Sequence, residues 1–393
     1  MELSKDRGGI SSRFSSIYTL CFILVLITVR VFDEDPKLYY VPKYLMLLFF
    51  ALMIFHSIRY GLQLGKSFLL PTIFFLLEVL SWIWSYNRSV AGSQLWTQVQ
   101  LYILFFFVYS LARDCDLTEV FYKGIYISGF VMILWILTKV GLRSYFSQMQ
   151  NAVRMGGDFG NENTFGLLFA SSVLVAFFYF LSTKKIVHLL SVFAFIFFSF
   201  SSGSKKALVL IVIGLFIIMF AFFGLRKAGK ILIYTVLAGL LLLFLLRLPI
   251  FSVVNDRMMA YLNGDFDYSN YNRAMMISNG FELFKNSPIW GYGLNNFSCI
   301  AGGGTYSHNN YIELLVSLGL LGTIAYYVMF LKPSIIYARL ALFGNKRYII
   351  IFLLAVVEIG FGYGMVQFYS KSTWILLGLL LGSLDNQEMI KLE

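Results

Sequence analysis

The feature that most constrains the fold of this chain is a series of long apolar stretches that recur along almost its whole length. Each has about the 17 to 25 residues that an α-helix needs to cross a hydrocarbon layer roughly 30 Å thick. Because lipid offers no hydrogen bonds, a chain that crosses it repeatedly must satisfy its own backbone, as a helix does. We expect an all-α, polytopic integral membrane protein, one membrane domain over residues 1–393, with about 12 transmembrane helices near 15–32, 38–58, 68–86, 95–112, 119–141, 164–182, 186–201, 206–224, 229–250, 309–331, 348–369 and 372–384.

Composition and charge exclude two other classes of protein. Only 13% of the residues are charged, against about 25% in ordinary soluble domains. The net charge of +11 is explained by Lys and Arg beside the spans, and the basic stretches lack the interleaved aromatic residues of a nucleic-acid binder. We therefore expect membrane lipid, and no nucleic acid, as a partner.

The distribution of Lys and Arg also predicts how the chain crosses the membrane. Cations flanking short connections stay in the cytoplasm, and they are more frequent in the connections on the side of the N-terminus. Both termini are therefore expected to be cytoplasmic. The basic start MELSKDRGGISSR precedes an apolar run with no small-residue cleavage site, which indicates a retained first helix. Cys21, Cys115 and Cys299 fall in a span, an inner loop and an outer loop, so no disulfide is expected.

Two outer connections are too long to be simple links between spans. They are an outer loop at 142–163 and a large outer loop at 251–307, between the ninth and tenth spans. Long ordered loops usually carry function, so a binding surface on the outer face is expected. In the second loop, Asp265 and Asp267 form a pair, but no third ligand lies at metal-binding spacing. We expect an acidic surface loop and no metal site.

The large loop also contains a helical pattern. Asn270 and Asn272 are candidate N-caps, Pro288 ends the pattern, and Arg273 continues its apolar stripe one turn earlier, a stripe made of Met276, Ile277, Gly280, Phe281 and Phe284. We expect a short amphipathic helix at the membrane surface, whose N-terminus presents Arg273 and unpaired N–H groups to an anion. The alternative is that Arg273 only extends to the lipid headgroups, and spacing alone does not separate the two.

His308 is the one histidine in a position suited to chemistry. It stands at the outer mouth of the tenth span among polar residues, where an imidazole titrates near neutral pH and reaches water or substrate. It is the candidate general base. The alternative is a polar interface residue, because Asn310 and Glu313 have the spacing of a capping box and would then only cap the span.

Further charged residues have both a structural and a functional interpretation. Lys205 and Lys206, in the stretch SFSSGSKK, are either a cationic flank or point charges that bind phosphate, and Arg154 is a candidate for the same outer region. Glu78 and Glu358 fall within spans, so each is expected to face the bundle interior and to have a partner there.

Several of these motifs follow one another in a recognisable order, namely Ser204 to Ala207, then Arg273, then Pro288 to Gly293 with Asn296 and Phe297, then His308 and Asn309 with Ile312 and Glu313, then Gly319 to Gly322. This order resembles the O-antigen ligase and O-antigen polymerase superfamily of bacterial envelopes. Residues 157–163, GDFGNEN, look like the family's upstream Gly-x-Phe-x-Asn-x-Asn segment. The resemblance covers roughly residues 154–322.

What the resemblance implies is a glycosyltransferase, independent of metal and cofactor, on the outer face of the bacterial inner (cytoplasmic) membrane. Its donor would be a glycan on undecaprenyl pyrophosphate. By the match of motifs, His308 would activate the acceptor hydroxyl, Arg273 would hold the pyrophosphate, and Lys205 would stand where the family usually has arginine. Lysine lacks the planar bidentate clamp of arginine, so Lys206 is an alternative to Lys205. Arg154 would add charge, and the supporting residues would be Asn161, Asn163, Tyr292, Asn309 and Glu313.

The resemblance leaves two members of the superfamily open. A polymerase would join lipid-linked repeat units into O-antigen or capsular polysaccharide, and a chain-length regulator would be its expected partner. A ligase would transfer the glycan to the lipid A core of lipopolysaccharide. We favour the polymerase because polymerases are the more numerous members. Direct attack would invert the anomeric carbon, whereas a covalent intermediate would need a carboxylate, and only Glu313 is conveniently placed.

A transporter such as a polysaccharide flippase is a more distant alternative. Transporters often consist of two related halves, but here the large loop follows the ninth span and the polar residues gather outside.

Overall fold

A computed structural model gives the fold of the chain. It describes residues 7–392 apart from positions 63, 152, 225, 226, 228, 302 and 303 and most of 231–267. The ninth predicted span, 229–250, and the pair Asp265 and Asp267 lie largely or wholly outside the described residues. In the described part the structure is helical, with no strand and one isolated bridge between Asn309 and Tyr363.

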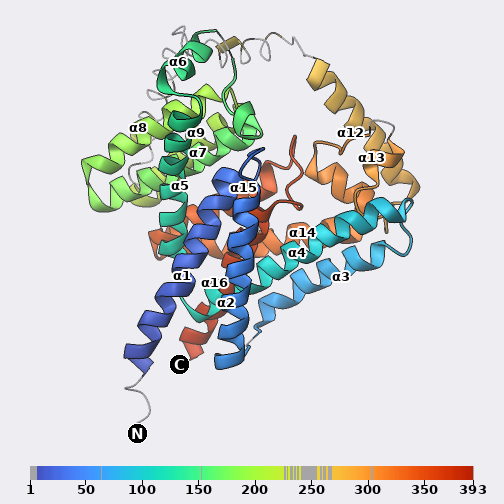
Figure 1. Ribbon diagram of the computed structural model, residues 1–393, viewed down its shortest axis with the longest axis horizontal. Helices are drawn as coiled ribbons and strands as arrows, with labels where there is room; N and C mark the ends of the chain where they lie inside the picture. Colours follow the sequence, from blue (N-terminus) through green and yellow to red (C-terminus); the bar gives the residue numbers. More distant parts are fainter. Residues whose placement is uncertain are drawn as a thin grey trace. The chain divides into compact units, whose positions relative to one another are not determined.

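Each of the other predicted spans coincides with a helix (Figure 1). The helices are α1 (Arg7–Phe32), α2 (Tyr40–Tyr60), α3 (Leu69–Ser81), α4 (Arg88–Asp114), α5 (Thr118–Lys139), α7 (Glu162–Thr183), α8 (Ile186–Ser201), α9 (Lys205–Phe223), α14 (Asn310–Phe343), α15 (Ile349–Gly360) and α16 (Lys371–Leu392). Among the described helices, six are long and apolar enough to cross a membrane, namely α2, α4, α5, α7, α9 and α14. The all-α, polytopic class of fold is confirmed.

Shorter helices lie in the connections. They are α6 (Leu142–Gln150), α12 (Tyr268–Asn286) and α13 (Phe297–Ile300), together with single 3₁₀ turns η1 (Lys66–Phe68), η2 (Gly157–Phe159) and η5 (Lys346–Tyr348). The first outer loop, predicted as a connection over 142–163, is thus partly helical. Two spans are shorter than predicted, because α3 ends at Ser81 and α15 at Gly360, and the residues that follow them make loop contacts instead.

The chain divides into two compact units. The first comprises residues 1–49, 118–265 and 338–353, and its centre is α7, which packs against α5, α8 and α9 (Figure 1). Small residues permit this packing, because a side chain at Gly129 would meet Phe195 and Ser172, and one at Gly214 would meet Leu174. Close approach at small residues is typical of helices that associate within lipid.

The second unit comprises residues 50–117, 266–337 and 354–393. Its main contact joins α4 and α16. Gly378 and Gly382 of α16 face the backbone of α4, and an added Cβ at Gly378 would lie 3.0 Å from the carbonyl oxygen of Phe105. Aromatic rings fill the rest of the core, and Trp374 contacts Phe105 at a centroid distance of 5.9 Å.

Helix α14 is broken one third of the way along its length. Gly319 has φ of 64° and ψ of −163°, so the helix stops there and resumes. The segment Pro288–Gly293 fills the break, with Tyr292 N–H donating to Val316 O (2.8 Å), Gly293 N–H to Ser317 O (2.9 Å) and Leu320 N–H to Pro288 O (2.8 Å). Backbone groups that an intact helix would pair internally are therefore paired with a loop.

Candidate functional site

His308 lies at the N-terminal end of α14, in a strained and firmly held conformation. Its φ is 52°, a left-handed value that is uncommon for a residue with a side chain. Its neighbours Ser307 and Asn309 are buried, while the His308 side chain is partly exposed. The Ser307 hydroxyl donates to Asn309 O (2.8 Å) and accepts from Asn309 N–H (3.3 Å). Such strain persists where the surroundings impose it, and it is typical of functional positions.

The cap of α14 differs from the predicted capping box. Asn309, and not Asn310, accepts hydrogen bonds from the N–H groups of Tyr311 (2.9 Å) and Ile312 (3.2 Å). Glu313 is fully buried, and its Oε2 accepts from Ser307 N–H at 2.8 Å. The capping-box interpretation was therefore wrong in its residues, because Glu313 reaches past the helix end and holds the backbone next to His308.

Asn310 has a different task, which the sequence did not indicate. Its Oδ1 accepts from the N–H groups of Gln367 (2.8 Å) and Phe368 (3.1 Å), and its own N–H donates to Gly362 O (2.7 Å). These bonds fix the segment 361–370 against the start of α14, which explains why α15 ends at Gly360.

Arg273 is the cation that acts on His308. Burial, and next to it the positive charge of Arg273, lower the pKa of His308 below its ordinary 6.5. At neutral pH the imidazole is therefore predominantly unprotonated, as a general base must be. Tyr306 also contacts it, with ring centroids 4.3 Å apart. The structure thus brings together Arg273, Tyr306 and His308 within the second unit.

The helix that carries Arg273 is confirmed, but its predicted start was wrong. Because α12 begins at Tyr268, Asn270 and Asn272 lie inside it, and Arg273 stands more than one turn from its first residue instead of among unpaired N–H groups. Met276 and Ile277 of the apolar stripe, together with Leu283, contact a buried cluster of Phe297, Ile312 and Val316, whereas Phe281 of the stripe is exposed. A side chain at Gly280 would meet Ile312. Helix α12 is therefore docked on the start of α14.

Tyr292, predicted as a supporting residue, acts through its backbone. Its N–H pairs with Val316 in the break of α14, and its carbonyl accepts from Tyr86 N–H at 3.0 Å. Its hydroxyl donates to Leu283 O of α12 at 3.3 Å. Tyr292 therefore connects α12, the broken helix and the connection after α3, all within the second unit.

In the first unit, Arg154 lies between the start of α7 and the end of α8. Its guanidinium donates to Ser202 O (3.0 Å) and Asn163 Oδ1 (3.3 Å), and it forms an ion pair with Glu162 (3.6 Å). Asn161 is the N-cap of α7, accepting from Asn163 N–H (2.8 Å). The structure thus brings together Arg154, Asn161 and Asn163.

Lys205 is the first residue of α9 and belongs to the same region. Ser204 is the N-cap of α9, and an added Cβ at Gly166 of α7 would lie 2.9 Å from Ser204 Cβ. The N-terminal ends of α7 and α9 are therefore adjacent. Lys205 and Lys206 are both partly buried there. Two positive helix ends with nearby cations favour an anion such as phosphate.

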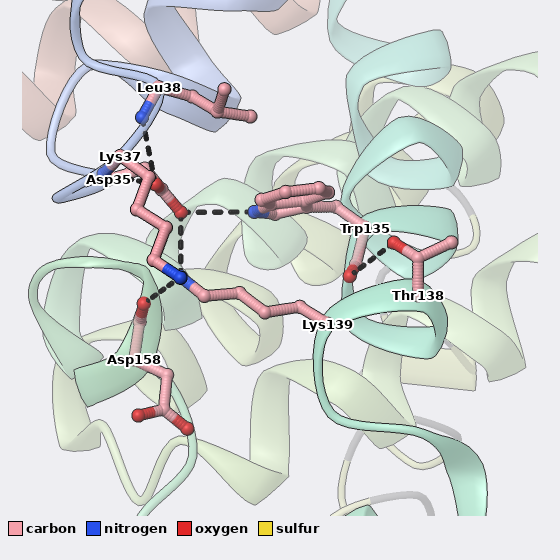
Figure 2. Close-up of polar contacts among 7 residues, drawn as sticks. All are labelled: Asp35, Lys37, Leu38, Trp135, Thr138, Lys139 and Asp158. Carbon is pink, nitrogen blue, oxygen red and sulfur yellow. Dashed lines mark hydrogen bonds and ion pairs between the residues drawn. The ribbon is translucent and has the colours of Figure 1, made fainter.

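A buried ion pair fixes the turn that precedes α7 (Figure 2). Asp35 is fully buried, and its carboxylate accepts from Lys139 Nζ (2.9 Å), Trp135 Nε1 (3.0 Å) and the N–H groups of Lys37 and Leu38. Lys139 Nζ also donates to the carbonyl of Asp158. Burial raises the pKa of Asp35, but the hydrogen bonds, that of Lys139 foremost, outweigh it and lower the pKa overall. The sequence analysis missed this pair, which joins the α1–α2 connection to the turn before Asn161.

The predicted site residues therefore form two groups, one in each compact unit. Among the residues that the structure describes, no group of three or more His, Cys, Asp and Glu side chains is arranged to hold a metal ion. Glu78 and Glu358 both lie in the second unit. Glu358 accepts from the Thr373 hydroxyl (3.0 Å), whereas both carboxylate oxygens of Glu78 are buried without a hydrogen-bond partner.

Fold and site together define a multi-pass, all-α membrane protein in which a histidine and an arginine meet beside a broken helix. Residues 189–327 match a family model described as O-antigen ligase. This range contains Lys205, Arg273 and His308, so the resemblance to the O-antigen ligase and polymerase superfamily is confirmed, and the function is of the O-antigen ligase or polymerase type. Arg154, Asn161 and Asn163 precede the matched range. No curated protein matches the chain.

Proposed function

We propose that this protein is a glycosyltransferase that polymerises undecaprenyl-pyrophosphate-linked repeat units into O-antigen or capsular polysaccharide. The reaction takes place on the outer face of the cytoplasmic membrane, and both termini of the chain lie in the cytoplasm. The observation that carries the proposal is His308, which is held by buried neighbours in a left-handed conformation and whose pKa is lowered by burial and by the positive charge of Arg273. A base beside a cation is what displacement of a pyrophosphate from an anomeric carbon requires.

In the proposed reaction, His308 takes the proton of the acceptor hydroxyl while that oxygen forms a bond to the anomeric carbon. The bond from this carbon to the pyrophosphate oxygen breaks, and its electron pair leaves with the pyrophosphate. Arg273 stabilises the negative charge that develops there. Because the acceptor displaces the leaving group directly, the anomeric configuration inverts.

In this reaction Glu313 is a positioning residue and not a covalent nucleophile. Its carboxylate is fully buried and is bonded to Ser307 N–H, one residue before His308. A nucleophile must meet the sugar, whereas this oxygen holds the backbone of the loop. In the first unit, Arg154 and Lys205 bind phosphate beside the starts of α7 and α9, and this role needs no metal ion.

The transfer itself is tested with purified protein in lipid and a single lipid-linked repeat unit. A ladder of products supports the polymerase. Product only when lipid A core is added indicates the ligase instead, and no product with either acceptor refutes both. Inversion is tested separately, since a product that keeps the donor's anomeric configuration contradicts direct displacement.

The roles of His308 and Arg273 are tested with matched controls. His308→Ala is expected to abolish transfer at a normal protein level, while His188→Ala, which changes a histidine of the first unit, leaves it intact. Arg273→Lys is expected to reduce transfer strongly, because lysine lacks the bidentate geometry. Lys285→Ala on the same helix, exposed and paired with Glu282, is the control. Full activity of Arg273→Lys would show that Arg273 only anchors α12 to lipid.

A further inference from the structure

The second unit buries several polar groups that have no hydrogen-bond partner. Glu78, near the C-terminal end of α3, is completely buried, and both of its carboxylate oxygens are unpartnered. Glu313 Oε1, from α14, is also buried without a partner. Buried polar groups are almost always satisfied by protein or by ordered water. This concentration of exceptions indicates something that satisfies them together.

The unpartnered groups belong to one place. The Tyr369 hydroxyl interacts electrostatically with the carboxyl groups of both Glu78 and Glu313, and the Ser317 side chain and the Asn295 backbone act on it as hydrogen-bond partners. Glu78 belongs to α3. Glu313 and Ser317 lie one turn apart on α14, and Tyr369 belongs to the segment 361–370, which is bonded to Asn310. Three separate parts of the second unit therefore direct oxygen atoms toward a common interior.

The charges in this interior are not balanced by a cation. The groups that act on Glu78, Glu313 and Tyr369 are hydroxyl, carboxyl and amide groups, and the nearby Tyr326 and Glu358 are of the same kinds. No lysine, arginine or histidine is among these groups in the described part of the second unit. Two ionised carboxylates in such surroundings would each lose their hydration without a compensating charge. One of them must therefore carry a proton.

We propose that Glu78, Glu313, Ser317 and Tyr369 form a hydrated proton-binding site in which Glu78 is the neutral acid and Glu313 the carboxylate. The assignment follows from their donors. Glu313 accepts from Ser307 N–H at 2.8 Å, and a hydrogen bond to a carboxylate favours its charged form. Glu78 has no donor in the protein, but as a neutral acid it donates its own proton. Water between the four groups completes the bonds that the two carboxyl groups lack.

The site has a consequence for the proposed glycosyltransferase, and this part of the inference rests on the proposed function. The neutral acid Glu78 stabilises the carboxylate of Glu313 through water, and that carboxylate holds Ser307 next to His308. Glu78 is therefore a positioning residue, because it acts on the base through the second carboxyl group and the loop. Its loss should lower the rate of transfer more than the affinity for substrate.

The proton is tested by infrared difference spectroscopy on the purified protein without substrate. Glu78→Gln, which keeps the size and the hydrogen bonding of the neutral acid, is expected to remove one carbonyl band of a protonated carboxylic acid. Glu282→Gln, which changes an exposed and ion-paired carboxylate on α12, is expected to remove only a carboxylate band. Loss of a carboxylate band in Glu78→Gln would overturn the proposal. This measurement does not depend on any transferase activity, so it stands even if the proposed function fails.

The positioning role is tested by comparing two variants at the same residue. Glu78→Gln is expected to keep kcat within about twofold of the unchanged protein, whereas Glu78→Leu, which leaves the water and Tyr369 without a partner, is expected to lower kcat about tenfold with KM unchanged. Equal activity of the two variants would refute the role. Where Glu78→Leu does not accumulate, the infrared band of Glu78→Gln still decides whether the site binds a proton.

Discussion

Replacement of Glu313 by glutamine separates the two chemical roles that a buried carboxylate beside His308 can have. If Glu313 holds the loop, the glutamine carbonyl oxygen takes over the bond from Ser307 N–H, which is 2.8 Å long in the unchanged protein. If Glu313 is a nucleophile, the amide cannot form a glycosyl ester. Glu313→Leu is the matched variant, because it removes both functions at similar volume.

The magnitudes follow from the hydrogen bond. A bond to a charged acceptor contributes about 1.5–3 kcal/mol and a neutral bond about 1 kcal/mol, so glutamine loses about 1 kcal/mol of the interaction. If this loss of about 1 kcal/mol acts entirely through a less favourable placement of His308, kcat falls about fivefold. Leucine leaves a buried N–H unsatisfied at a cost of about 2–3 kcal/mol, which corresponds to about 30- to 150-fold. Removal of a covalent nucleophile costs at least about 10³-fold.

The assay is the initial rate of chain extension with a lipid-linked repeat unit, at equal amounts of folded protein. We expect a small loss for Glu313→Gln and a loss at least several times larger for Glu313→Leu. A loss of 10³-fold or more in Glu313→Gln, with a glycosylated protein trapped in the unchanged enzyme, would refute the positioning role and with it direct displacement.

Three further perturbations test the break in α14, the buried ion pair and the base. Gly319→Ala should destabilise the protein by about 2 kcal/mol or more, because φ is +64° and the new Cβ would meet the docked loop. Gly360 has open space around it, so the control Gly360→Ala should leave the thermal unfolding temperature unchanged. Asp35→Asn should lower the free energy of unfolding by about 3 kcal/mol at neutral pH. Because the pKa of Asp35 is lowered in the folded protein, its contribution to stability is present above its ordinary pKa of 3.8 and is lost as the pH falls through the folded value. The unfolding temperatures of the variant and the unchanged protein should therefore converge in acid. Arg273→Gln should raise the pKa of His308 and move the acidic limb of the kcat/KM profile to higher pH, measured on the low residual rate of this variant. A limb that does not move would show that a group other than His308 titrates.

Hydropathy alone was sufficient to place the helices, because a span is defined by its length of apolar residues and needs no knowledge of its partners. It was insufficient at the interruptions. The stripe through Gly319 is continuously apolar, so nothing in its pattern indicates that the helix opens there. The break exists because a loop from earlier in the chain supplies the hydrogen bonds, and such a contact has no local signal.

The candidate site shows the same division between local and distant information. His308 and Arg273 were indicated by their residue types and positions, but the capping interpretation failed because Asn309 and Asn310 are adjacent and equally suited to the role. Asp35 and Lys139 lie 104 residues apart, and each alone reads as an ordinary flanking charge. The polar interior around Glu78 likewise emerges only when α3, α14 and the segment 361–370 are brought together.

The loop docked in the break of α14 has a consequence for how related sequences are able to vary. Its attachment in the break uses two N–H groups and one carbonyl of the main chain, so the exposed side chain of Ile289 takes no part in these bonds, whereas the ring of Trp290 contacts that of Trp84 at a centroid distance of 5.5 Å. Gly291, Gly293 and Gly319 have positive φ and lie against neighbouring chain atoms that leave no room for a Cβ. Substitution should therefore be tolerated at 289 and not at the three glycines, and an insertion between 288 and 293 should be as damaging as the loss of a catalytic group.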